Sequence, residues 1–94
     1  MRVRGTRTAL RNLDEEAKDI ATDGPDGVRT VVQRVLDAVG SLSEQPSLGR
    51  PGRVPGTREL VVRKTRYIVP YRVKGDVIKV FRVFHASRRL PNRW

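Results

Sequence analysis

Apolar residues recur at helical spacing near the start of the chain. In the stretch "TRTALRNLDEEAKDIATDG" (6–24) they fall at intervals of three and four, at Leu10, Leu13, Ala17 and Ile20. This period predicts an amphipathic helix. Thr6 is a suitable N-cap, and Gly24-Pro25 is a stop signal. The acids of this stretch are expected on its solvated face: Asp14, Glu15, Glu16 and Asp19.

The next stretch, "PDGVRTVVQRVLDAVGSLSEQP" (25–46), repeats the helical period with a broader stripe. Its apolar positions are Val28, Val31, Val32, Val35, Leu36, Val39 and Leu42. Spacings of three and four exclude a strand, whose apolar positions would alternate. Valine is a weak helix former, so tertiary packing must stabilise this second helix.

The rest of the chain alternates as strands do. A short first strand, "MRVR", ends at Gly5, and three further strands are predicted at 58–62, 66–73 and 77–85. Three prolines and three glycines make 46–57 a loop, and Lys74-Gly75-Asp76 predicts a hairpin. Pro70 cannot donate to a β-ladder, which favours an edge position or a bulge for its strand.

The predicted order is β-α-α-β-β-β. It indicates an α+β fold in which two antiparallel N-terminal helices pack on one face of a small antiparallel sheet. The length of 94 residues suits a single domain spanning 1–94. The last strand would place Arg82 and His85 on opposite faces if it stayed regular.

Charge is distributed unevenly between the two halves. The chain has 20 Lys and Arg against 10 Asp and Glu, for a net charge of +10. Residues 1–49 have a net charge of −1, whereas residues 50–94 have a net charge of +11. Such an asymmetry predicts attraction of a phosphate backbone or of an acidic protein.

Several classes of protein are excluded by composition. Without cysteine there is no disulfide framework, and with one histidine there are too few ligands for a zinc site. No P-loop or nucleophile elbow occurs. No apolar run reaches the ~20 residues of a membrane span, and no signal peptide is visible. We therefore expect a cytoplasmic protein that uses neither metal nor cofactor.

Three sequence motifs, in this order and spacing, resemble those of a known family. They are "MRVR...T..AL.NL", "PSLGRPGRVPGTRELVV" and "YIVPYRVKGDVIKVFRVFHASR". Together they resemble the RelE/ParE superfamily of toxins from type II toxin–antitoxin pairs over nearly the whole chain. The resemblance implies a cognate antitoxin, with an acidic neutralising segment that wraps the toxin.

The resemblance leaves two targets open. RelE-like members cleave mRNA in the ribosome without a metal, whereas ParE-like members poison DNA gyrase without catalysis of their own. The basic C-terminal half slightly favours the endoribonuclease. Two positions depart from the nuclease pattern: Ile68 stands where nuclease members carry an arginine, and Ala86 where some carry a tyrosine.

Within this resemblance, three residues are the candidates for catalysis. Histidine has a pKa near neutrality and arginine binds phosphate oxygens, so we expect His85 as acid–base and Arg72 and Arg82 as phosphate ligands. Tyr67 and Tyr71 fall on one strand face, where stacking on bases and a place in the core are both open; Tyr71 is a candidate for binding nucleic acid or the antitoxin. The remaining candidates for binding nucleic acid or the antitoxin are basic: Arg50, Arg53, Arg58, Arg63, Lys64, Arg66, Arg88, Arg89 and Arg93.

Overall fold

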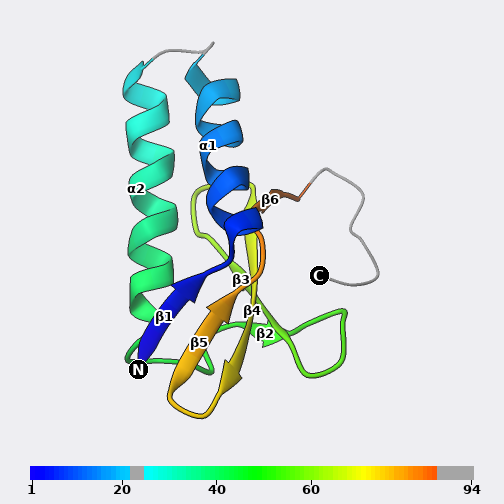
Figure 1. The fold of residues 1–94 in the computed structure, drawn as a ribbon. Coiled ribbons are helices and arrows are strands. Elements are labelled where there is room, and N and C mark those ends of the chain that lie inside the picture. The colour runs from blue at the N-terminus through cyan, green and yellow to red at the C-terminus, as the bar shows by residue number, and fades with distance from the viewer. Residues whose placement is uncertain (22–24, 87–94) are drawn as a thin grey trace.

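The computed structural model describes residues 1–21 and 25–86 of the chain. Two helices, α1 (Arg7–Ala21) and α2 (Pro25–Ser41), form an antiparallel hairpin, as Figure 1 shows. The strands are β1 (Arg2–Gly5), β2 (Arg50–Pro51), β3 (Arg58–Val61), β4 (Tyr67–Lys74), β5 (Val77–Val80) and β6 (Phe84–His85). The predicted α+β fold with two N-terminal helices is confirmed. Neither helix in the described part of the chain is both long and apolar enough to cross a bilayer.

The predicted helix ends are set by local chemistry. The Oγ1 atom of Thr6 accepts a hydrogen bond from the amide of Ala9 at 3.0 Å, which confirms Thr6 as the N-cap of α1. The same hydroxyl donates to the carbonyl oxygen of Phe81 at 2.8 Å and so ties the start of α1 to the sheet. Pro25 occupies the first position of α2, where its missing N–H costs nothing. The stop signal itself, at residue 24, lies outside the described residues.

The sheet is mixed, with the strand order β1-β5-β4-β3-β2, and β6 pairs with β4 beside the end of β5. Adjacent pairs are antiparallel except β1 and β5, which run parallel with Arg4 opposite Lys79. A parallel neighbour is possible for β1 because the helical hairpin lies between it and the rest of the sheet in sequence. The short β2, inside the predicted loop 46–57, was not expected.

The predicted strand 77–85 is broken in the middle. Residues 81–83 belong to no strand, and they separate β5 from β6 opposite Pro70 of β4. The carbonyl oxygen of Pro70 accepts a hydrogen bond from the amide of Phe81 at 2.9 Å. Pro70 has no N–H to offer in return, so the ladder stops there. β4 is a central strand, so the edge alternative was wrong. Residues 81–83 face only residues 69–70, and this one extra residue is the irregularity that the bulge alternative predicted.

The core lies between the helical hairpin and one face of the sheet. Alternate residues of the strands point into it, and they meet residues of both helices. Its buried members are Ala9, Val35, Leu42, Leu60, Val62, Tyr67, Val69, Tyr71, Ile78, Val80 and Val83. On the opposite face, Ile68 and Pro70 of β4 are buried, whereas β1, β5 and the Arg72–Lys74 end of β4 present exposed side chains; we call this exposed part the open face of the sheet.

Two expectations for α1 were wrong. Leu10, expected in the apolar stripe, is 63% exposed, whereas its neighbour Ala9 is buried. Glu16, expected on the solvated face, is buried and accepts a hydrogen bond from the hydroxyl of Tyr67 at 3.1 Å. The face of α1 that meets the sheet includes Glu16 because β4 supplies a polar partner there.

Candidate binding surfaces

The three candidate catalytic residues are spread over the sheet. His85 pairs with Tyr67 in register, and their rings meet edge to face with centroids 5.4 Å apart. Arg72 lies five residues further along β4, about 17 Å away at strand spacing, and alternation places it on the opposite face from Tyr67. Arg82 lies in the break between β5 and β6, where it is half-buried and its Nε atom has no hydrogen-bond partner among the described residues. Arg72 and His85 are not brought together.

The tyrosine among the binding candidates lies inside the core. Tyr71 has no exposed surface. Its hydroxyl donates to the carbonyl oxygen of Pro46 at 2.7 Å and accepts from the amide of Gly49 at 2.8 Å. Tyr71 therefore anchors the loop after α2 and cannot contact a base, which corrects the prediction.

Three of the candidate arginines surround the loop between α2 and β3. Glu59 is buried, and its carboxylate accepts hydrogen bonds from the backbone amide of Arg53 at 2.7 Å and from Nη2 of Arg50 at 3.3 Å. The guanidinium of Arg58 donates to the carbonyl oxygen of Gly49 at 2.8 Å. Arg50 and Arg58 thus hold the loop, while the side chain of Arg53 is exposed.

The remaining basic candidates lie around the β3–β4 turn or beyond the described residues. Arg63, Lys64 and Arg66 are exposed in or beside this turn. Arg66 and Arg72, which flank Ile68, are six residues apart, or about 20 Å along an extended chain. They do not converge on one phosphate. The tail arginines lie outside the described residues: Arg88, Arg89 and Arg93.

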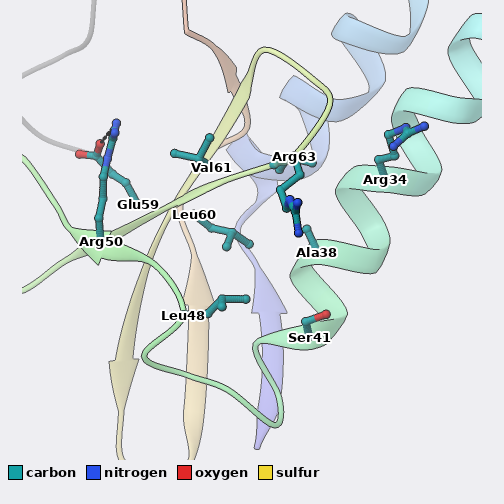
Figure 2. Close-up of a pocket in the computed structure, with 10 residues that line it drawn as sticks. Arg34, Ala38, Ser41, Leu48, Arg50, Glu59, Leu60, Val61 and Arg63 are labelled. Carbon is teal, nitrogen blue, oxygen red and sulfur yellow. Dashed lines mark hydrogen bonds and ion pairs between the residues drawn. The ribbon is translucent and has the colours of Figure 1, made fainter.

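A groove of about 480 Å³ separates α2 from β3 (Figure 2). Leu60 contributes to its apolar floor and Leu48, 48% exposed, adds apolar surface, whereas the side chain of Val61 points to the other face of β3 (Figure 2). Figure 2 shows Arg34 on the α2 side and Arg63 on the opposite side. This groove was not predicted, because its walls come from segments that are distant in sequence.

The outer edge of β3 is partly free beside the groove. The short β2 pairs only with Arg58 and Glu59. On that side, no strand in the described part of the chain pairs with Leu60 or Val61. An unpaired strand edge is a template for an added strand. The groove, with Arg34 and Arg63 beside it, thus lies next to an unpaired stretch of the β3 edge.

The open face of the sheet is a second surface, and it is basic. Arg4 of β1, Lys79 of β5 and Arg72 of β4 are successive partners in register, so they form a row across three strands. Arg2 and Lys74 flank Val77 in the next row. All five basic side chains are exposed. Of these five only Arg72 was among the predicted site residues; the alternation of basic residues in "RVR" and "RVK" was the signal for Arg2, Arg4 and Lys74.

This two-helix hairpin on a small mixed sheet has a counterpart among solved structures. The solved "Chromosomal ParDE TA system from P. aeruginosa" superimposes with a TM-score of 0.84 at 30% identity, covering 93% of this chain and 97% of that one. Residues 3–90 match the sequence model of the family described as ParE toxin of type II toxin-antitoxin system, parDE. The chain belongs to this ParE toxin family of the RelE/ParE superfamily.

A curated relative supports the same assignment. The Sinorhizobium fredii (strain NGR234) protein named "Putative toxin Y4kP" is 47% identical over 90 residues, which cover 96% of this chain and 93% of that protein. The resemblance to the superfamily is therefore confirmed. Within it, the matches favour the ParE alternative over the mRNA endonuclease that the charge slightly favoured.

Proposed function

We propose that this toxin acts by binding DNA gyrase and inhibiting it, without catalysis of its own. Membership of the ParE family supports this target. The separation of Arg72 from His85 supports the absence of nuclease chemistry, since an acid–base group and a phosphate ligand must reach the same phosphate. Gyrase and its DNA are cytoplasmic, so the proposal places the toxin there.

A structural role for His85 follows from its contacts. The imidazole packs against Tyr67, whose hydroxyl donates to Glu16 of α1. His85 thus supports a polar link between β4 and α1 in the core. A His85→Phe variant keeps an aromatic ring against Tyr67 but removes any acid–base function, whereas His85→Ala removes both.

The experiment that tests the target measures gyrase supercoiling with the purified toxin and, in parallel, mRNA cleavage in cells that express it. We expect inhibition of gyrase supercoiling, and intact mRNA by primer extension after expression in cells. His85→Phe should retain both results. Cleaved mRNA with unaffected supercoiling, and loss of that cleavage in His85→Phe, would overturn the proposal and restore the endonuclease.

For the partner, we propose that the groove between α2 and β3 binds the antitoxin. The ParDE structure supports a cognate antitoxin as the occupant. The apolar floor suits apolar side chains of that partner, and Arg34 and Arg63 suit acidic ones. The free edge at Leu60 and Val61 suits an extended segment that adds a strand to β3.

Two leucines of equal exposure make a matched test of the groove. Leu48 lines the groove and is 48% exposed, whereas Leu36, on α2 but not among the groove residues, is 49% exposed. Leu48→Asp should weaken binding of the antitoxin encoded by the adjacent reading frame at least ten-fold in calorimetry. Leu36→Asp should leave the affinity within about two-fold. Equal losses in both variants would show that the groove is not the docking site.

A further inference from the structure

The open face of the sheet concentrates positive charge without any acid between the strands. Five exposed basic residues come from three strands, and we call them the basic face: Arg2, Arg4, Arg72, Lys74 and Lys79. The strands β1, β4 and β5 contain no Asp or Glu at all. Asp76, in the turn between β4 and β5, is the acid nearest in sequence. No ion pair to these five side chains occurs within the described residues.

The register gives the basic face a fixed geometry. Strands lie about 4.8 Å apart, so the row of Arg4, Lys79 and Arg72 extends over about 10 Å. The row of Arg2 and Lys74 follows two residues away along the strands, at about 7 Å. Because hydrogen-bonded strands hold the backbones, these cations are kept close together despite their mutual repulsion. Such an arrangement matches a closely spaced array of negative charges.

We propose that the basic face binds the phosphate backbone of double-stranded DNA. Duplex DNA carries about one charge per 1.7 Å of its axis, which can engage all five cations. The contact itself does not depend on gyrase being the target. Its consequence for inhibition does rest on the proposed function: a toxin on gyrase would also hold the DNA that gyrase has bound.

The surroundings of the basic face favour a duplex over single-stranded nucleic acid. Single strands are bound by aromatic side chains that stack on the bases. Both tyrosines are buried in the core, and Phe81 is half-buried with the ammonium of Lys79 5.5 Å from the centre of its ring. Within residues 1–21 and 25–86, the basic face therefore offers charge without a fully exposed aromatic ring on which bases could stack. Charge alone suits a paired backbone whose bases are already stacked.

The same surroundings distinguish the basic face from a protein-binding surface. Protein interfaces are anchored by apolar or aromatic residues at their centre. The centre of the basic face is Lys79, with Arg4 and Arg72 on either side. The exposed apolar residue Leu48 lies in the groove beside α2 instead. The two surfaces thus differ in chemistry, and DNA is the occupant that fits the basic one.

The test compares two double variants that lose the same charge. Arg72→Gln/Lys79→Gln removes two cations from the basic face, and Arg11→Gln/Arg29→Gln removes two exposed cations from the helices. Binding of the purified toxin to a labelled 30-base-pair duplex of arbitrary sequence is followed by fluorescence anisotropy from 50 to 300 mM salt. All four side chains are exposed, so both variants should fold, and the thermal midpoint checks this.

For the unaltered toxin we expect a slope of log K against log salt of about −4.5, from five phosphate contacts at 0.9 each. The basic-face variant should reduce this slope by about 2 and weaken binding roughly 60-fold at 0.1 M salt. The helix variant should stay within about three-fold, because salt screens distant charges. Replacement of the pair by Arg72→Lys/Lys79→Arg should restore the slope.

Three results would overturn the proposal. The first is an equal loss of duplex affinity in the two double variants, and the second is binding of single-stranded DNA as tight as that of the duplex. The third is a basic-face variant that loses affinity for the antitoxin while its affinity for DNA is unchanged. Supercoiling by gyrase is assayed in parallel. A toxin that binds duplex through the basic face but leaves gyrase active would sustain this inference and contradict the proposed function. The two failures are thus distinguishable.

Discussion

The hydroxyl of Tyr71 is expected to be the most costly single polar group to remove from the described core. Tyr71 has no exposed surface, and its hydroxyl links the carbonyl oxygen of Pro46 to the amide of Gly49. Tyr71→Phe removes only the oxygen and leaves both partners without a hydrogen bond. Gly49 is buried and Pro46 is half-buried, so water can replace the lost bond only at Pro46.

The expected loss can be worked out from these two groups. An unsatisfied buried N–H costs about 1–3 kcal/mol, and a half-buried carbonyl costs less, so the free energy of unfolding should fall by about 2–3 kcal/mol. For a domain of this size, that lowers the thermal midpoint by about 10–15 °C. Inhibition of gyrase, the proposed target, should be unchanged at temperatures where the variant is folded.

The measurement is urea unfolding of the purified toxin, followed by circular dichroism. Ile78→Val is the control, because Ile78 is equally buried and loses a single methylene group without any hydrogen bond. Its cost should be about 1 kcal/mol. If Tyr71→Phe cost no more than this control, the two hydrogen bonds would contribute nothing to stability, and Tyr71 could not be the anchor of the loop.

Three further predictions concern stability. In Gly49→Ala the new methyl group would lie 2.6 Å from Cε1 of Tyr71. We therefore expect the free energy of unfolding, measured in urea, to fall by about 1–3 kcal/mol. A fall of less than about 0.5 kcal/mol would contradict the close approach. In Glu59→Gln one of the two donors, Nη2 of Arg50 or the amide of Arg53, would face the side-chain N–H₂ group instead of an acceptor. The free energy of unfolding should fall by about 1–3 kcal/mol, and proteolysis of residues 50–57 should be faster. Unchanged proteolysis would refute this. Lys64 has a φ of 62°, a left-handed conformation that glycine adopts without strain. Lys64→Gly should therefore raise the free energy of unfolding by about 0.5–1 kcal/mol, whereas Arg63→Gly should not. A loss of stability at both positions would contradict backbone strain at Lys64.

Local sequence patterns were sufficient for the order of the main elements. The period of three and four fixed both helices, because an amphipathic helix needs one apolar side wherever it packs. Thr6 capped α1 as predicted, and Gly75, with a φ of 61°, forms the turn that the hairpin pattern indicated. These features depend on a few neighbouring residues, so they can be deduced without knowing the rest of the fold.

The candidate site was less predictable, because it depends on which strands become neighbours. The separation of Arg72 from His85 depends on the pairing of β6 with β4, which places His85 opposite Tyr67, five residues before Arg72. Glu16 changed from a surface acid to a buried acceptor because Tyr67, 51 residues later, lies opposite it. A helical pattern shows which side is apolar, but it does not show which polar groups of another element will meet that side.

The sequence by itself determined two helices, alternating strands and a strongly basic C-terminal half. Only the tertiary structure decided where that charge acts. The parallel pairing of β1 with β5 brings Arg4 beside Lys79, 75 residues later in the chain, and the pairing of β5 with β4 adds Arg72. The physical reason is that alternation assigns each residue to one of two faces, whereas strand order and register, which arise from packing of the whole chain, decide which residues share a surface.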